Sequence, residues 1–468
     1  MTQQTESGIE TLIPQLSALV ARMEERVPYA AVLVTDVDGE ILRMGTTEEK
    51  VAPVAPARGA VFTVHTGRAL VEAATDELTP DALQAAAMDA VARALETGID
   101  TDAAAPNPGP ELIADYVTHE ATPLDSIPLA TRVDHARALR DRAHAADERV
   151  VNTFGMVSHT RTREVFVNRS RQLFQNLVRT QAVVGVTASD GAHQAALVDG
   201  RGHQGGWEAT ELPDGLVDKL VSDCCRILGA PRLAAGYYDC IFSPEFSGIF
   251  AHEAFGHGTE ADMFEKQRSR GQDFIGKPVA TEGVNMYDNP DLPDAAASYH
   301  FDHEGQSAVR TQIIEKGVLV RPITDMHTAH TLGIGRTANG RRESFAKKAY
   351  TRMSNTYFGE GDNDFDEMLA DISHGFYLTR PSNGMEDPKS WGIQLEGYMA
   401  WEIVNGKLTG TVFSPVIVTG YVPELLKSIT MVGKRAEITG LGMCGKGYKE
   451  WVKVTDGGPH LRLKARLA

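Results

Sequence analysis

The first hundred residues of the chain alternate between helical and extended patterns of hydrophobic positions. From Ile9 to Val27 the apolar residues recur every three or four positions, which predicts one face of an amphipathic helix. Between residues 29 and 45, apolar and β-branched residues stand on both sides of an Asp38-Gly39 pair. Because Asp-Gly is a favoured two-residue turn, this segment predicts a hairpin of two strands.

Further strands and a helix are expected before residue 100. Two short strands are predicted at 61–65 and 69–74, where β-branched and apolar residues gather. Thr79-Pro80 then begins an alanine-rich helix that reaches about Glu96, because threonine is a good N-cap and proline suits the first helical turn. Residues 100–112 contain three prolines and predict an exposed connection.

The pattern changes character near the middle of the chain. A helix over about 129–146, antiparallel strands over 149–189 and a helix over about 213–228 are expected first. Beyond Pro231 the sequence has short strand patterns, many glycines and few long helical patterns. The chain is therefore predicted to be an α+β protein of two domains. Residues 1–230 would form an α/β-type domain with antiparallel strands, and residues 231–468 a β-rich domain.

Composition narrows the classes of function. The 468 residues include 46 Lys+Arg and 63 Asp+Glu, a formal charge of −17, which disfavours binding to nucleic acid or to an anionic membrane. No apolar run is long enough for a membrane helix, and the N-terminus has no signal-peptide pattern. The four cysteines are too few for a disulfide scaffold. We therefore expect a soluble cytoplasmic protein. Its length by itself predicts two or three domains.

A candidate metal-binding motif lies in residues 243–262. Ser243 and Pro244 predict the start of a helix that contains His252-Glu253-Ala254-Phe255-Gly256-His257. Histidines at i and i+5 lie about 140° apart on a regular α-helix, which would separate two ligands of one metal. A π-type turn at Gly256 would bring them into line. Alternatively, the two histidines and the glutamate form only the polar face of a buried helix.

A catalytic zinc site usually has three protein ligands, so a third is needed. Cys444 is the candidate, because it lies in a segment with four glycines, 440–449, that can approach a metal closely. Lys446 nearby would help to stabilise its thiolate. Glu260 and Asp262 follow the second histidine. They could be a further ligand, hydrogen-bond partners of the imidazoles, or ordinary solvated charges.

Three separated motifs resemble one known family. HEAFGHGTEAD, residues 252–262, is similar to the H-E-A-x-G-H-x-x-E-x-D signature of the TldD/PmbA (TldD/TldE) family of metallopeptidases. NGRRESFAKKAYTRMSNTYF, residues 339–358, and ITMVGKRAEITGLGMCGKG, residues 429–447, resemble two further segments of that family. The motifs occur in the same order as in the family, and the resemblance extends more weakly over the N-terminal half.

The resemblance implies a site and an activity. It implies Zn²⁺ held by His252, His257 and Cys444, with Glu253 as the catalytic acid and base. It implies a two-domain α+β subunit whose β-rich C-terminal domain carries the metal site. It also implies that the subunit is of the metal-bearing, TldD-like type, works as a dimer and cuts extended or unfolded peptides. The dimer would be a homodimer or a heterodimer with a paralogue that lacks the motif.

Some expectations go beyond the matched motifs. Arg341 or Arg342 could stabilise the oxyanion of a peptide-bond hydrolysis, or could form a structural ion pair with Glu343. The resemblance implies a Gly-Gly-x-Val-Asp stretch near the active site, and residues 382–397 differ from it. The difference affects the expected contacts with the substrate more than the expected metal ligands.

Two other functions stay open on the sequence. One is a biosynthetic amide hydrolase that removes a leader peptide or an aminoacyl group from a natural-product intermediate. The other is a non-catalytic scaffold or regulatory subunit whose HExxxH motif is structural.

Overall fold

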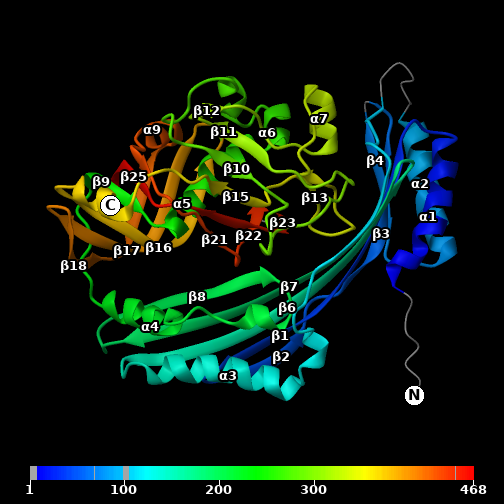
Figure 1. Ribbon diagram of the computed structural model, residues 1–468. Coiled ribbons are helices and arrows are strands. Elements are labelled where there is room, and N and C mark those ends of the chain that lie inside the picture. Colours follow the sequence, from blue (N-terminus) through cyan, green and yellow to red (C-terminus); the bar gives the residue numbers. More distant parts are fainter. Residues whose placement is uncertain (1–7, 68, 98–104, 448) are drawn as a thin grey trace.

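The first half of the chain forms one strongly curved sheet of very long strands (Figure 1). The computed structural model describes residues 8–67, 69–97, 105–447 and 449–468; the first part of the predicted connection 100–112 lies outside these ranges. The strand order is β4-β3-β1-β6-β7-β5, with β2 beside β1 and β8 beside β7. The strands are β1 (Ala30–Gly45), β2 (Glu49–Pro53), β3 (Ala57–His65), β4 (Leu70–Thr75), β5 (Leu112–Val117), β6 (Val150–Asn168), β7 (Arg171–Ser189) and β8 (Gln194–Gln204).

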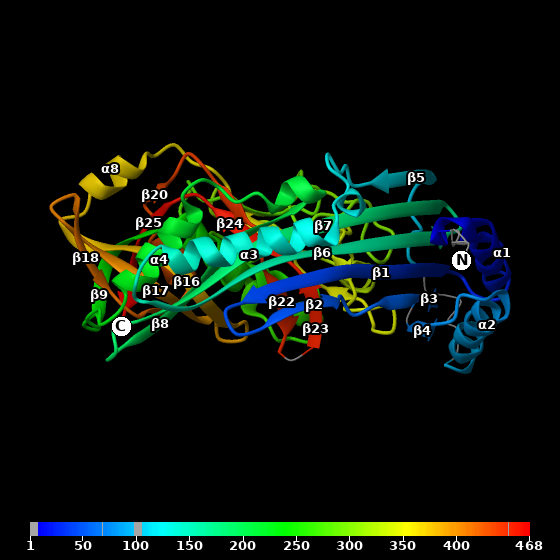
Figure 2. The ribbon, with the colours of Figure 1, turned by 90° about the horizontal axis from the view of Figure 1, so that it is seen from below.

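Helices cover this sheet at two places (Figures 1 and 2). The helices are α1 (Ile13–Glu24), α2 (Pro80–Glu96), α3 (Leu129–Ala145) and α4 (Leu216–Arg226), each within a few residues of its predicted range. At one end, α1 and α2 bury Leu16, Val20 and Leu83 against Val32 and Phe62 of the sheet. Helix α3 packs along β6 and β1. The predicted N-cap is confirmed, since the Thr79 hydroxyl accepts a hydrogen bond from the backbone N–H of Ala82.

The predicted hairpin at Asp38-Gly39 is wrong, because β1 runs without interruption from Ala30 to Gly45. The strand keeps β6 on one side throughout and exchanges β3 for β2 on the other side near Gly39. A Cβ atom at Gly39 would overlap the backbone carbonyl of His159 on β6. Here the glycine serves a close approach of two strands and not a turn.

The second half contains two smaller sheets. The seven-stranded one consists of β9 (Gly236–Phe242), β16 (His374–Asp387), β17 (Gly392–Val404), β18 (Lys407–Phe413), β19 (Val416–Tyr421), β20 (Met431–Val432) and β25 (Leu461–Leu467). The six-stranded one consists of β10 (Met286–Asp288), β11 (Thr311–Glu315), β12 (Val318–Leu319), β15 (Asn355–Phe358), β21 (Glu437–Thr439) and β24 (Thr455–Gly458). Two separate hairpins are β13 (Gly340–Arg341) with β14 (Tyr350–Thr351), and β22 (Met443–Lys446) with β23 (Lys449–Lys453).

Helix α5 (Pro244–Ala251) contacts both of these sheets, through β16 and β24. Its Phe246 and Phe250 pack with Phe242 and Phe358 in the largest hydrophobic core. The remaining helices are α6 (Ala261–Glu265), α7 (Met326–Leu332), α8 (Phe365–Ala370) and α9 (Val422–Lys427). The α+β class is confirmed, with mainly antiparallel sheets in both halves of the chain; the pairs β5–β7, β9–β16 and β15–β24 are parallel. The domain boundary near residue 230 stays a prediction.

Polar contacts join the long sheet to the second half. Arg342 forms an ion pair with Glu72 of β4, and the Gln175 side chain of β7 donates to the carbonyl of Phe301 at 3.1 Å. In the described part of the chain, no helix is both long and apolar enough to cross a membrane.

Candidate metal centre

The helix that carries the histidines begins where the sequence predicts it. The Ser243 hydroxyl accepts a hydrogen bond from the backbone N–H of Phe246 at 3.3 Å, and Pro244 occupies the first helical position. After Ala251 the helix widens into a π-turn over His252–Gly256. A Cβ at residue 256 would overlap the Met353 sulfur, so a larger residue there would require the Met353 side chain to move. The predicted widening is confirmed, and it gives the i and i+5 histidines a common direction.

His252, His257 and Cys444 converge on one point. The Nε2 atoms of His252 and His257 lie 3.1 Å and 3.2 Å from the Cys444 sulfur. One donor atom from each of the three residues lies within 4.8 Å of the others, and the two rings are almost perpendicular. In a tetrahedral zinc site with these ligands, nitrogen and sulfur would be roughly 3.5 Å apart. A small opening of the cluster therefore admits the ion, and two imidazoles with one thiolate fit zinc chemically.

The hairpin of β22 and β23 supplies the thiol. Cys444 pairs with Val452 across this hairpin and is 7% exposed, so the sulfur reaches the histidines from a β-strand rather than from a loose loop. A Cβ on the neighbouring Gly445 would lie 3.0 Å from the Trp451 ring. The glycine therefore lets the hairpin close over its own aromatic residue.

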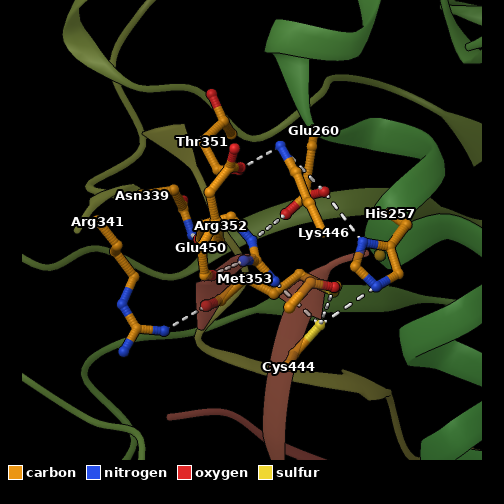
Figure 3. A network of polar contacts seen from close by, with 12 residues as sticks. His257, Glu260, Asn339, Arg341, Thr351, Arg352, Met353, Cys444, Lys446 and Glu450 are labelled. Carbon is orange, nitrogen blue, oxygen red and sulfur yellow. Dashed lines mark hydrogen bonds and ion pairs between the residues drawn. The ribbon is translucent and has the colours of Figure 1, made fainter. Parts of the chain in front are cut away.

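A closed ring of buried contacts fixes two of the three donors (Figure 3). The Nδ1–H of His257 donates to the Glu260 carboxylate at 3.0 Å, and the Nε–H of Arg352 donates to the same carboxylate at 3.0 Å. The other end of the Arg352 guanidinium donates to the Cys444 sulfur at 3.0 Å. Because the carboxylate engages Nδ1 of His257, the Nε2 atom is the one directed at the metal position.

Lys446 adds a second cation to this ring. Its ammonium group donates to the Asp262 carboxylate at 2.6 Å and to the Thr351 carbonyl at 3.0 Å, and lies 3.4 Å from Glu260. Glu260 is thus the hydrogen-bond partner of an imidazole, one of the three roles left open by the sequence. Asp262 does not contact the imidazoles; its carboxylate accepts hydrogen bonds from the ammonium groups of Lys446 and Lys266.

Mutual electrostatics ionises the cluster. Burial alone would raise the pKa of the Cys444 thiol, but the His252 and His257 imidazoles outweigh it and lower the pKa to about 5. Burial lowers the pKa of His257, and the Cys444 and Glu260 charges reverse this and hold it well above its usual value. Burial raises the pKa of Glu260, and the surrounding cations, Lys446 first, bring it below its ordinary range. The sulfur is therefore poised as a thiolate, the form that binds a metal.

Glu253 lies beside the cluster without being part of the ring. Its side chain is half-buried and packs against Gly384 of β16, where a Cβ would overlap the glutamate side chain. Among the described residues no hydrogen bond or ion pair engages its carboxylate. The group is therefore free to accept a proton from a water molecule.

A second glutamate, Glu386 of β16, is also near the site and was not anticipated. Both of its carboxylate oxygens are buried without a hydrogen-bond partner in the described structure, and so is the indole nitrogen of Trp391. A Cβ at Gly258, next to His257, would lie 3.2 Å from each of these groups. Burial, together with the charges of Glu253 and Glu260, raises the pKa of Glu386 well above its usual value despite the nearby His257. The sequence marks segment 382–397 only as a departure and does not single out Glu386.

Comparisons with known proteins identify the family of this chain. A profile described as the PmbA/TldA metallopeptidase C-terminal domain matches residues 235–466. A metalloprotease of Methanothermobacter thermautotrophicus is 32% identical over 74% of this chain and 76% of its own length. The chain belongs to the TldD/PmbA family of metallopeptidases.

Two further matches are a curated relative and a solved structure. A zinc metalloprotease TldD homolog of Saccharolobus solfataricus is 32% identical, and the match spans 49% of this chain and about half, 51%, of that relative. The crystal structure of TldE from Thermococcus kodakarensis superposes with a TM-score of 0.75 over 97% of this chain and all of that one, at 17% identity. That structure therefore confirms the fold alone.

The three family motifs meet at the cluster, and one of them contributes a residue that sequence reasoning missed. Arg352 lies in the RMSNTY segment of the second motif and is fully buried between Glu260 and Cys444. Its place in a matched motif was the only signal available. Arg341, in contrast, donates to the Met353 carbonyl, and its guanidinium lies 5.1 Å from the centre of the Tyr299 ring.

Arg342 is engaged with the long sheet. It pairs with Glu72 and donates to the Lys347 carbonyl at 2.8 Å, while the Glu343 carboxylate accepts the backbone N–H of Glu450 at 2.8 Å. The structure therefore brings Arg352, and not Arg341 or Arg342, to the thiolate. An oxyanion-stabilising role for Arg341 or Arg342 stays an untested prediction.

Proposed function

We propose that this chain is a zinc-dependent peptidase that hydrolyses amide bonds of extended or unfolded peptides. One observation carries the proposal: two imidazoles and a thiolate converge beside a glutamate whose carboxylate has no partner in the described structure. The metalloprotease relatives support the same class of activity. A bound zinc ion would polarise the scissile carbonyl and lower the pKa of a water molecule.

In this proposal Glu253 is the general base and then the general acid. Its carboxylate takes a proton from the attacking water and gives it to the leaving amine when the amide bond breaks. The position of Glu253, directly after His252 in the π-turn, keeps the carboxylate next to the metal ligands. Burial of the surrounding side chains removes competing water and strengthens the charge interactions of this carboxylate.

Glu260 and Arg352 orient the ligands rather than react. Glu260 holds the His257 ring, and Arg352 holds both Glu260 and the Cys444 sulfur. A guanidinium beside the thiolate also withdraws negative charge from the sulfur, which would make the metal a stronger electrophile.

A second candidate, a biosynthetic amide hydrolase acting on a natural-product intermediate, has one supporting observation. Segment 382–397 departs from the family pattern, and it places the unpartnered Glu386 and Trp391 beside His257. Two polar groups without partners suit recognition of a polar substrate group, such as the terminal amine of a leader or aminoacyl unit.

The assembly and the compartment are also proposals. A fold shared with TldE is compatible with a dimer, either of two copies of this chain or with a paralogue that lacks the motif. The four cysteines are all unpaired thiols, as expected in a reducing cytoplasm.

The deciding experiment compares Glu253→Gln with the wild type and with Glu282→Gln, an exposed glutamate in a distant turn. Purified proteins are assayed for zinc content and for cleavage of an unfolded protein such as labelled casein. We expect Glu253→Gln to keep its zinc and lose activity by about 10²- to 10⁴-fold, while Glu282→Gln matches the wild type.

Other results would reject specific parts of the proposal. Wild-type turnover by zinc-loaded Glu253→Gln would eliminate the general-base role. A wild type that holds no metal, and whose properties do not change on chelation, would favour the non-catalytic scaffold with a structural HExxxH motif.

A further inference from the structure

A cavity of about 480 Å³ lies between the long sheet and the second half of the chain. Strands β1, β6 and β7 form one wall, and the β22–β23 hairpin forms part of the other through Met443, Trp451 and Lys453. Figure 1 shows this hairpin between the C-terminal sheets and the long strands. The hairpin that presents Cys444 to the histidines therefore also borders a separate chamber.

Three cations meet in this chamber without a carboxylate partner among the described residues. The Arg179 guanidinium donates to the backbone carbonyls of Ala296 at 2.6 Å and Ser298 at 3.1 Å. Arg341 donates to a backbone carbonyl and faces an aromatic ring, as described above. The Lys453 ammonium has no hydrogen bond or ion pair within the described ranges.

The acidic residues of the cavity wall are already engaged. Glu164 contacts the His303 imidazole at 3.1 Å and accepts a hydrogen bond from Gln175 at 2.6 Å. Asp302 accepts backbone N–H groups of Glu304 and Gly340, each at 3.0 Å. Glu343, the third acidic residue of the wall, accepts the backbone N–H of Glu450 at 2.8 Å. In the described structure none of these carboxylates forms an ion pair with Arg179, Arg341 or Lys453.

Burial and mutual repulsion disfavour the charged forms of two of these cations, and they outweigh the attraction of Glu164 for Arg179 and of Asp456 for Lys453. Burial, and then the charge of Arg341, lower the pKa of Arg179 to about 10. Burial, and then the charge of Arg179, lower the pKa of Lys453 to about 8. Arg179 and Lys453 are half-buried, and a partly desolvated charge without a counter-ion raises the free energy of the folded protein. Binding of an anion would therefore be favourable.

We propose that Arg179, Arg341 and Lys453 form a binding site for an organic carboxylate in this cavity. The guanidinium and ammonium groups supply the charge, and Ser158, Thr160 and Gln181 supply further polar contacts. Leu177 and Leu441 give the wall an apolar part. A chamber of this size with a mixed lining fits an anion that carries a hydrocarbon body better than bare inorganic phosphate.

The carboxylate can come from two sources. It can be the C-terminal carboxylate of a peptide-like substrate or the carboxylate of a free small molecule. The site is a binding site in either case, and its existence is independent of the hydrolysis proposed above.

The test uses probes that contain no peptide bond. Zinc-loaded full-length protein is titrated calorimetrically with 5-phenylpentanoate, with 5-phenylpentanamide and with inorganic phosphate. We expect the acid to bind at least tenfold more tightly than the amide or phosphate. Lys453→Met and Lys453→Gln should each weaken the acid at least tenfold, while Lys407→Met, on the exposed strand β18, should bind it as the wild type does.

A competition experiment distinguishes the two possible sources of the carboxylate, and other results would overturn the proposal. Competition of N-acetyl-trialanine, but not of its C-terminal amide, with 5-phenylpentanoate assigns the site to a peptide terminus; absence of competition assigns it to a free carboxylate. Equal binding of acid and amide, preferred binding of phosphate, or unchanged binding in both folded Lys453 variants would overturn the proposal. None of these results depends on Glu253 or on turnover, so they leave the proposed function untouched.

Discussion

The two groups of buried charge beside the β22–β23 hairpin are organised in opposite ways. At the Cys444 end, the carboxylate of Glu260 contacts His257, Arg352 and Lys446, so buried charges of both signs are in contact. At the Lys453 end, Arg179 and Arg341 contact backbone carbonyls, a hydroxyl and an aromatic ring, and neither they nor Lys453 contact a carboxylate of the described chain.

This difference distinguishes two ways of building a site. A matched network fixes the direction of donor atoms, which a metal with a strict geometry requires. In an unmatched group, the cost of removing the charges from water is not offset by a partner in the protein, and a bound ligand of opposite charge can offset it. The comparison therefore predicts that damage to the first network destabilises the protein, whereas removal of a charge from the second stabilises it.

The largest expected effect is on activity, after removal of the thiolate. Cys444→Ala should reduce bound zinc from one per chain to none. Cleavage of unfolded peptide should fall by roughly 10³-fold or more, because the metal contributes several kcal/mol of transition-state stabilisation. Zinc content by elemental analysis and turnover are the two measurements. Cys240→Ala, at a fully buried thiol of the core, is the control and should keep both; loss of zinc in that variant would make the Cys444 result uninformative about ligation.

The second effect is on stability. Glu260→Gln leaves Arg352 and Lys446 buried with their shared counter-charge removed, which should cost about 3–5 kcal/mol of unfolding free energy. Zinc affinity should fall by about 10- to 100-fold, because His257 loses the partner that orients it. Urea unfolding and a competitive zinc titration measure the two changes. Glu265→Gln is the matched control, since its pair with His327 at 3.2 Å is part-exposed and should contribute less than about 1 kcal/mol.

The same variant has a defined pH dependence. The pKa of Glu260 is lower in the folded protein than in an unfolded chain, so its contribution is present above about pH 4.3, the unfolded value. It is lost as the pH falls from there towards the folded pKa. The gap in stability between wild type and Glu260→Gln should therefore narrow below about pH 4, and a gap that widens with acidity would contradict the assignment.

The smallest effect has the opposite sign. Lys453 has a pKa of about 8 in the folded protein and about 10.4 when unfolded, so folding disfavours its charged form. The penalty is absent above pH 10.4, grows as the pH falls, and is complete below pH 8. Lys453→Met should therefore raise the unfolding free energy at pH 7 by on the order of 1–3 kcal/mol, and the gain should disappear near pH 10.5. Thermal unfolding against Lys407→Met checks this; a destabilised Lys453→Met protein would remove the contrast between the two groups.

Part of the candidate site could be deduced from local rules. The angular spacing of His252 and His257 requires a distorted helix, and Gly256 is the residue that permits it, so the π-turn was predictable. The N-cap at Ser243 and the role of the glycines around Cys444 could be predicted for the same reason, because each depends on residues that are close in sequence.

Other parts were not predictable from spacing. Arg352 is 92 residues from Cys444, and its contact with the thiolate depends on how the β22–β23 hairpin meets the segment after β14. The Asp38-Gly39 pair has the composition of a turn, but its glycine allows β1 to approach β6. Local preference was outweighed there by the pairing of a sixteen-residue strand with its neighbours.

The sequence by itself determined the α+β class, the helices α1 to α5, the family and the set of candidate zinc donors, because periodicity, caps and motifs are local properties of the chain. Only the tertiary structure decided which charges are matched. The ring through His257, Glu260, Arg352 and Cys444, and the group of Arg179, Arg341 and Lys453, each join residues from distant elements. Whether a buried charge has a partner depends on how distant elements pack together, and the spacing of residues along the chain does not predict that packing.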